Sequence, residues 1–392
     1  MDDQELLERF AAVEVPATRL TPETLVGAGR RSVRRRRRRA VRVGCGAALA
    51  VGVLVAVPAV VSGTRGAPPA AGEQTVSCPV SRLPVPAAMR DVSPAAVDPT
   101  GRFIVGNNVV GDEPTDPRTG KVDGVAYTRP VLWVDRQPTE LAASVKAVRA
   151  TGVNSSGTVV AIAGEKHFDS VLRYRGGVPQ ELTMPPGDWD FSPQPAINAG
   201  GDVIATVQRR GGKMKDNVTL LWKAGSTTAV ELPLPAGTRA WGLTDDGRIV
   251  GEVWSADSLH ITAHVFDERG KDTRLATPGG QDAAVISVGG DWVSGNLWPS
   301  GTVVRWNIRT GEMTDLDLHT PGMAINGRGW VIADGKVQRD DAVVELAPAS
   351  EGSAGDPLDL ADNGTVVGAM LGYRDGSAGL VSSGPVVWQC GP

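Results

Sequence analysis

The sequence predicts an all-β protein, a seven-bladed β-propeller of four-stranded blades, and two observations carry this prediction. A short phrase recurs seven times: an apolar residue, a small or polar residue, two turn residues, Gly, any residue, and two or three apolar residues. Short strands and Gly turns that repeat with a period of about 45 residues are typical of propeller blades. The copies are VDPTGRFIVG (97–106), VNSSGTVVAI (153–162), INAGGDVIAT (197–206), LTDDGRIVGE (243–252), ISVGGDWVSG (286–295), INGRGWVIAD (325–334) and LADNGTVVGA (360–369).

Each copy is expected to form the inner strand, a turn and the second strand of one blade. The shared Gly fits a turn position with positive φ, and the Asn or Asp before it closes the turn through its side chain. A third strand with an aromatic residue and a short fourth strand follow. The aromatic positions are Trp133, Tyr174, Trp222, Phe266, Trp306 and Trp388.

The two ends of the repeat region are predicted to close the ring. The seventh unit stops after its third strand, at VVWQCGP. The segment CPVSRLPVPA (78–87) matches the fourth strand VELPLPA (230–236), so we expect it to supply the missing outer strand. This alignment places Cys78 and Cys390 in one hairpin turn, which fits the geometry of a disulfide.

The region before the repeats predicts a membrane anchor. Residues 43–61 carry no charge, which is about the length needed to cross a bilayer. Nine arginines lie between Arg30 and Arg42, and this bias places that end in the cytoplasm and in contact with anionic lipid. The alternative is a cleaved signal peptide, whose charged region would be unusually long.

The predicted organisation is therefore that of a single-pass protein of the cell membrane. It has a cytoplasmic tail (1–40), a transmembrane helix (41–62), a linker (63–75) and an extracytoplasmic propeller (76–392). The first 62 residues hold 11 Arg and six acidic residues, whereas the remainder holds 29 basic and 38 acidic residues. An acidic domain of this kind argues against a nucleic-acid partner.

Binding is expected on the face that points away from the membrane. This face carries the connections from second to third strands and from fourth to first strands, which are long and irregular: 111–126, 164–170, 184–195, 208–217, 347–357 and 372–383. Long loops on a rigid scaffold commonly carry binding residues. The candidate ligand-binding residues are Arg90, Asp91, Glu165, His167, Asp188, Trp189 and Asp190.

The segment from Asp188 to Asp190 has two competing interpretations. An exposed indole between two carboxylates suits a sugar or a cation. The alternative is a loop whose Trp caps the blades. No residue is assigned a catalytic role, and no metal or cofactor is expected, because His260 and His264 lie too far apart on a strand to share an ion.

The repeats INAGGDVIA and INGRGWVIA resemble the HAF-type repeats of extracellular propellers. More loosely, residues 76–392 are similar to the TolB-like and WD-like propellers. The high content of Arg, Ala, Gly and Val is associated with GC-rich genomes such as those of actinobacteria. The resemblance implies a binding or scaffold module that recognises a protein or a cell-wall glycan. The alternatives are a polysaccharide-degrading enzyme (a glycosidase or a lyase) with Asp188, Asp190 or Glu165 as acid and base, and a receptor that signals through the tail.

The predicted topology is tested with fusions to a reporter that is active only outside the cytoplasm. A fusion after Pro392 should be active and a fusion at Arg19 should be inactive, because the arginine cluster holds the amino terminus inside. The reverse pattern would refute the topology. A mature protein that begins near residues 63–72 would favour the signal-peptide alternative.

Overall fold

The computed structural model describes residues 77–89, 91–110, 126–318, 322–340, 342–348, 354–373 and 380–391. These residues belong to one compact unit, Gly72–Pro392. The tail, the transmembrane helix and the linker predicted before residue 76 lie outside the described residues. Within the described ranges, no helix is both long enough and apolar enough to span a bilayer.

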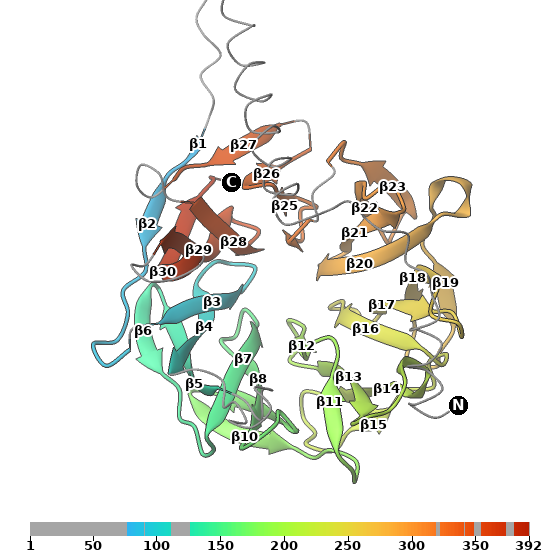
Figure 1. Ribbon diagram of the computed structural model, residues 1–392, viewed down its shortest axis with the longest axis horizontal. Coiled ribbons are helices and arrows are strands. Elements are labelled where there is room, and N and C mark those ends of the chain that lie inside the picture. The colour runs from blue at the N-terminus through green and yellow to red at the C-terminus, as the bar shows by residue number, and fades with distance from the viewer. Residues whose placement is uncertain are drawn as a thin grey trace, which may run out of the picture. The chain divides into compact units, whose positions relative to one another are not determined.

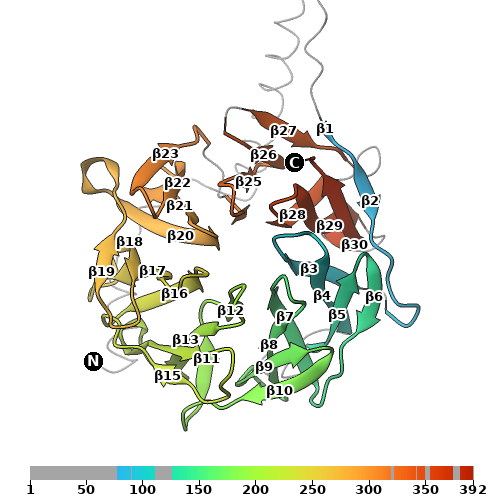
Figure 2. The same cartoon turned by 180° about the vertical axis from the view of Figure 1, so that it is seen from behind.

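The described strands form six hydrogen-bonded sheets arranged in a ring, so the fold is an all-β propeller (Figures 1 and 2). The sheets are built from antiparallel meanders, which we call blades and name by their inner strand. The β3 and β7 blades share one sheet through a single parallel bridge between Thr128 and Ala147. Two short 3₁₀ turns, Met214–Asp216 and Pro278–Gly280, interrupt the strand pattern.

The blades follow one another in chain order around the ring. The β3 blade contains β3 (Val92–Val97), β4 (Phe103–Val110), β5 (Tyr127–Val134) and β6 (Gln137–Glu140), and the β7 blade contains β7 (Ala147–Val153), β8 (Val159–Gly164), β9 (Ser170–Arg175) and β10 (Val178–Leu182). The β11 blade contains β11 (Trp189–Phe191), β12 (Ala196–Ile197), β13 (Val203–Arg209), β14 (Val218–Trp222) and β15 (Val230–Glu231), and the β16 blade contains β16 (Thr238–Leu243), β17 (Ile249–Trp254), β18 (Ile261–Phe266) and β19 (Asp272–Arg274). The β20 blade contains β20 (Asp282–Gly289), β21 (Trp292–Trp298), β22 (Val303–Asn307) and β23 (Glu312–Asp315), the β24 blade contains β24 (Ala324–Ile325), β25 (Val331–Ala333), β26 (Lys336–Gln338) and β27 (Val343–Leu346), and the β28 blade contains β28 (Ala354–Leu360), β29 (Thr365–Tyr373) and β30 (Leu380–Gln389).

The recurring phrase forms the turn between the first two strands of a blade, as predicted. All seven shared glycines have positive φ, between 55° and 86°. In the β7 blade, Asn154 Oδ1 accepts the backbone N–H of Thr158 at 3.0 Å and so closes its own turn. Its Nδ2 donates to the carbonyl of Asn198 in the next blade, also at 3.0 Å. The Asn therefore joins two blades as well as closing a turn.

The same contact recurs around the ring on the side of the Gly turns. Asn198 Nδ2 donates to Thr244 O at 3.1 Å, and Asn326 Nδ2 donates to Ala361 O at 3.0 Å. In the β3 blade an Asp takes the position, and Asp98 Oδ1 accepts the N–H of Phe103 at 2.7 Å. The prediction that an Asn or Asp closes this turn is confirmed for these four copies, whereas in the β16 blade Thr244 Oγ1 accepts the N–H of Arg248 at 3.0 Å instead.

The aromatic residues of the third strands are buried between neighbouring sheets. Four of them have no exposed surface: Trp133, Trp222, Trp306 and Trp388. Each of these four indoles donates to a carbonyl that follows the outer strand of the preceding blade. The acceptors are Pro84, Thr183, Ala276 and Ala347, at 2.7, 3.1, 2.7 and 2.8 Å. Because a buried indole N–H needs a partner, these bonds fix the spacing of adjacent sheets.

Tyr174 plays the same part in the β7 blade. Its hydroxyl donates to the carbonyl of Ala142, which follows the outer strand of the β3 blade, at 2.6 Å. Burial disfavours the phenolate and raises the pKa of Tyr174 to about 12. The side chain therefore stays a neutral donor at physiological pH.

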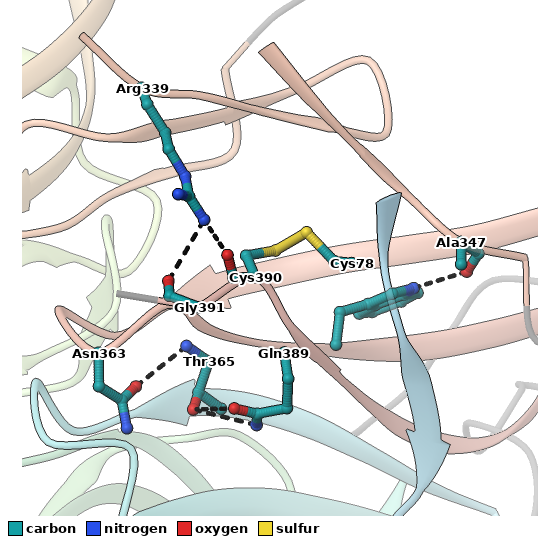
Figure 3. Close-up of a disulfide and its surroundings, with 9 residues drawn as sticks. Cys78, Arg339, Ala347, Asn363, Thr365, Gln389, Cys390 and Gly391 are labelled. Atoms are coloured by element: carbon teal, nitrogen blue, oxygen red, sulfur yellow. Dashed lines mark hydrogen bonds between the residues drawn. A yellow bond between two sulfur atoms is a disulfide. The ribbon is translucent and has the colours of Figure 1, made fainter. Parts of the chain in front are cut away.

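The amino-terminal segment closes the ring. β2 (Val80–Arg82) pairs antiparallel with β30, with Val80 opposite Trp388, and supplies the outer strand of the β28 blade. A disulfide joins Cys78 and Cys390, whose Cα atoms are 4.4 Å apart (Figure 3). The predictions of the closing strand and of the disulfide are both confirmed.

The same segment also contacts the preceding blade, a pairing that was not expected from the sequence. β1 (Ser77–Cys78) pairs parallel with β27, with Cys78 opposite Leu346. Near the disulfide, Arg339 Nη2 donates to the carbonyls of Cys390 and Gly391 (Figure 3). The closing segment therefore holds two blades together.

Replacing both Cys78 and Cys390 with Ser should lower the free energy of unfolding by about 2–5 kcal/mol, because the bond closes a long loop in the unfolded chain. The fold should persist, since β2 still pairs with β30 through its backbone. Thermal unfolding followed by circular dichroism measures the change. A variant that lacks residues 76–87 should lose more stability than the double Ser variant. Equal losses in the two variants would contradict the assigned closure.

Candidate functional site

The segment predicted as a binding loop forms a strand instead. β11 pairs with β13, with Trp189 opposite Arg209. Only 4% of Trp189 is exposed, its Nε1 donates to Pro185 O at 2.9 Å, and the Arg209 guanidinium lies 4.7 Å from the ring centre. The binding interpretation required an exposed indole and is therefore wrong. Trp189 instead packs into a core cluster, in agreement with the alternative that it caps the blades, although its segment forms a strand rather than a loop.

The carboxylates beside Trp189 remain on the surface. Asp188 and Asp190 are both exposed, and Asp190 forms an ion pair with Arg210 at 3.2 Å. This pair lies between two exposed side chains on the same blade, so it contributes little to stability.

The other predicted site residues belong to different blades. Glu165 and His167 are exposed in the connection from β8 to β9, where Glu165 Oε1 accepts the N–H of Lys146 at 3.1 Å. Asp91 is exposed before β3, and Arg90 lies outside the described residues. Among those that the structure describes, no predicted site residue lines the cavity described next.

A cavity of about 520 Å³ opens between the β16 and β20 blades. It lies at the end of the blades that carries the β17–β18 and β21–β22 connections. This is the face on which binding was predicted, although neither connection was among the long loops considered. The lining residues are Arg239, Trp241, Glu252, Trp254, Leu259, Ile261, Asp282, Ala284, Val285, Ile286, Trp298 and Pro299.

Glu252 forms the buried floor of this cavity. Its Oε1 accepts from Arg239 Nη1 at 3.1 Å and from Trp254 Nε1 at 3.0 Å, and its Oε2 accepts the N–H of Val285 at 3.3 Å. The residue is 2% exposed, and this burial raises the pKa of Glu252 above its ordinary value, while the Trp254 hydrogen bond and the Arg239 charge oppose the rise. An ion pair between Glu252 and Arg239 therefore lies at the floor of the cavity.

The bond from Val285 to Glu252 also has a structural role. In other blades a side chain likewise accepts an inner-strand N–H of the next blade: Asn107 accepts that of Ala150 at 2.7 Å, and Thr206 accepts that of Ala240 at 2.8 Å. Asp359 accepts that of Val97 at 2.8 Å, and burial of its carboxyl raises its pKa to about 6. Glu252 thus joins two blades and forms the floor of the cavity at once.

The remaining lining is aromatic and aliphatic. The Arg239 guanidinium lies 5.5 Å from the ring centre of Trp241, which stands at a bulge in the ladder between β16 and β17. At the rim, Trp298 is 57% exposed and Leu259 is 76% exposed. The lining therefore combines three indoles with the carboxylates of Glu252 and Asp282.

One of the predicted loops contacts a lining residue of this cavity. Ser192, in the 184–195 segment, accepts from Arg239 Nη2 at 3.0 Å. None of the lining residues was predicted from the sequence. An available signal was the Trp in RAWGL, because four other units carry Ala95, Thr151, Ile286 or Leu358 at the equivalent bulge position.

Solved structures similar to this chain are β-propeller proteins. Virginiamycin B lyase from Staphylococcus aureus is 14% identical with a TM-score of 0.51, and the match covers 80% of this chain and 98% of that chain. The β-propeller domain of the Trilobed protease from Pyrococcus furiosus, described as having an open velcro topology, is 9% identical with a TM-score of 0.50, over 74% of this chain and 96% of that chain. TolB from Acinetobacter baumannii is 13% identical with a TM-score of 0.40, over 76% and 63%.

No family model matches the sequence, and no curated protein sequence matches it. At these identities the similar structures show the fold alone. The chain is an all-β propeller, and its function has to be argued from its own side chains.

Replacing Arg239 with Met should lower the free energy of unfolding by about 3–5 kcal/mol at neutral pH, because Glu252 is then buried without its cation. The pKa of Glu252 would rise further above its unfolded value, so the folded state would bind a proton more readily. The loss should therefore shrink as the pH falls toward that of the protonated carboxyl. Urea unfolding at neutral and at mildly acidic pH measures this. The R239M/E252Q variant should lose less at neutral pH, and a loss in R239M that does not change with pH would contradict the assigned pair.

Proposed function

We propose that this chain is a membrane-anchored, extracytoplasmic binding module built on a ring of seven four-stranded blades. The observation that carries the proposal is the aromatic cavity between the β16 and β20 blades. Concave, mostly apolar sites with a few placed polar groups are the usual form of ligand sites. The ligand is a protein or a cell-wall glycan at the face that carries this cavity.

The disulfide supports an extracytoplasmic location. Cys78 and Cys390 are joined, and structural disulfides persist in oxidising compartments. The uncharged segment 43–61 and the preceding arginines support the anchor, and the I-N-x-x-G phrase resembles extracellular HAF-type repeats.

Binding is favoured over catalysis by the pairing of the acidic groups in the cavity. Glu252 accepts three hydrogen bonds, and Asp282 Oδ2 lies 3.0 Å from His260 Nδ1. General acid–base catalysis needs a group that can exchange a proton with a substrate. Glu252 is 2% exposed and accepts hydrogen bonds from Arg239, Trp254 and Val285, so it is better suited to shape the cavity than to transfer protons.

The proposal is tested with a soluble protein of residues 72–392, which contains all the described strands and their partners. Immobilised on a column, it should retain a surface component from envelope extracts of the source cells. A matched column carrying a variant with both Leu259 and Trp298 replaced by Ser should retain less of it. Equal retention on the two columns, or no retention on either, would contradict binding at this face.

A further inference from the structure

We infer that the cavity between the β16 and β20 blades binds a basic side chain, an arginine or a lysine, of a protein partner. This inference rests on the proposed binding function and narrows its ligand to one chemical class. Three observations carry it: an exposed indole with no cation over its ring, a carboxylate beside that indole, and the net charge of the lining.

The exposed Trp298 lacks a contact that other tryptophans of this protein make. A guanidinium lies between 4.3 and 5.5 Å from the ring centre of four of them: Trp189, Trp241, Trp292 and Trp330. Among the described residues, no cation lies over Trp298, which is 57% exposed at the rim of the cavity. Because the face of an indole attracts cations, this ring is available to a cation from outside the protein.

A carboxylate lies next to the same indole. The ladder between β20 and β21 places Asp282 directly opposite Trp298, and both residues line the cavity. Directly opposite residues share one face of a sheet, with Cβ atoms about 5 Å apart. Asp282 Oδ2 lies 3.0 Å from His260 Nδ1, and within the described part of the chain no group donates to its Oδ1. One cation can therefore contact the indole and this carboxylate together.

The charge of the lining also favours a cation. Its ionisable residues are Arg239, Glu252 and Asp282. Glu252 pairs with Arg239 at 3.1 Å on the buried floor, so the remaining charge is that of Asp282, whose side chain is 25% exposed. The imidazole of His260 offsets this charge only when it is protonated. A cation is therefore attracted and an anion repelled, whereas a neutral group gains nothing from the charge.

Two donors of the lining, Arg239 Nε and Trp241 Nε1, have no hydrogen-bond partner. Both atoms are buried, so a ligand in the cavity does not contact them. These donors therefore do not select between classes of ligand, and the test includes a neutral and a cationic sugar.

The apolar part of the lining matches the stem of a basic side chain. Leu259 is 76% exposed at the rim, and Trp254 lies opposite Ile261 in the ladder between β17 and β18. Arginine and lysine carry a run of methylene groups below the charged head, and they bury this stem along apolar surface. The stem can pack on this side of the cavity while the head lies near Trp298 and Asp282.

The test uses the ¹⁵N-labelled protein of residues 72–392 at about pH 8, where an ordinary imidazole is neutral, and follows its N–H resonances by NMR. The probes are N-acetyl-L-argininamide and N-acetyl-L-citrullinamide, which has almost the same shape but a neutral urea in place of the guanidinium. The argininamide should shift resonances of β20 and β21 with an affinity of about millimolar, and added salt should weaken it. The citrullinamide should bind about tenfold more weakly.

The variants D282N and W298L should each weaken binding of the argininamide by about fivefold. The first removes the charge and keeps the shape, and the second removes the aromatic face and keeps an apolar side chain. The matched control is D190N, because Asp190 is an exposed carboxylate on β11 and its replacement changes the net charge of the protein by the same amount. The control should bind as the unmodified protein does.

The inference is overturned by equal binding of the two amides, or by binding to D282N or W298L that is no weaker than binding to D190N. Tighter binding of methyl glucosaminide, a cationic sugar, or of neutral methyl N-acetylglucosaminide than of the argininamide would also overturn it. Either sugar result leaves the proposed binding function standing with a glycan as ligand. A loss of retention on the column with both Ser replacements, without binding of the argininamide, likewise keeps the proposed function and refutes the basic side chain.

Discussion

Neighbouring blades of this propeller are joined by hydrogen bonds from side chains of one sheet to backbone carbonyls of the next. At one position a buried indole or phenol on the third strand donates to a carbonyl beyond the outer strand of the preceding blade, as Trp222 does to Thr183. On the side of the Gly turns, an Asn donates toward the following blade, as Asn154 does to Asn198. Because buried polar groups must be paired, these bonds fix both the spacing and the order of the sheets. The core lies between adjacent sheets and depends on that spacing.

The junction between the last and the first blade repeats these bonds with residues from the two ends of the chain. Pro84 lies just after the closing strand, and its carbonyl accepts a hydrogen bond from the indole of Trp133. The carbonyls after the outer strands of other blades accept equivalent bonds. At the Gly turns, Asn363 Nδ2 donates to Thr100 O at 2.6 Å. The contact between these two blades is therefore equivalent to the other contacts between blades. The break in the backbone lies within the β28 blade, between β30 and β2, and there the disulfide adds a covalent link.

The cavity depends on the same contacts. Glu252 accepts an inner-strand N–H of the next blade and also forms the cavity floor, so the separation of the β16 and β20 blades sets the position of its carboxylate. Ser192, in the preceding β11 blade, accepts a hydrogen bond from Arg239 Nη2. The site is thus assembled from three consecutive blades, and its side chains stand on strands and short connections that the ring keeps rigid. Such a scaffold presents a preformed surface, which lowers the cost of ordering on binding.

The sequence by itself determined the strand period, the glycine turns, the third-strand aromatics, the closing strand and the disulfide. These features are local or recur at equivalent positions of the repeat, so the structure of one copy can be inferred from the pattern shared by all copies. Only the tertiary structure decided the burial of Trp189 and the parallel pairing of Cys78 with Leu346, because both depend on which strand edge lies next to the segment in the folded protein. The cavity could likewise not be predicted from the sequence. Trp241 and Trp298 belong to different repeat units, and a bulge and the spacing between two sheets bring them to one site.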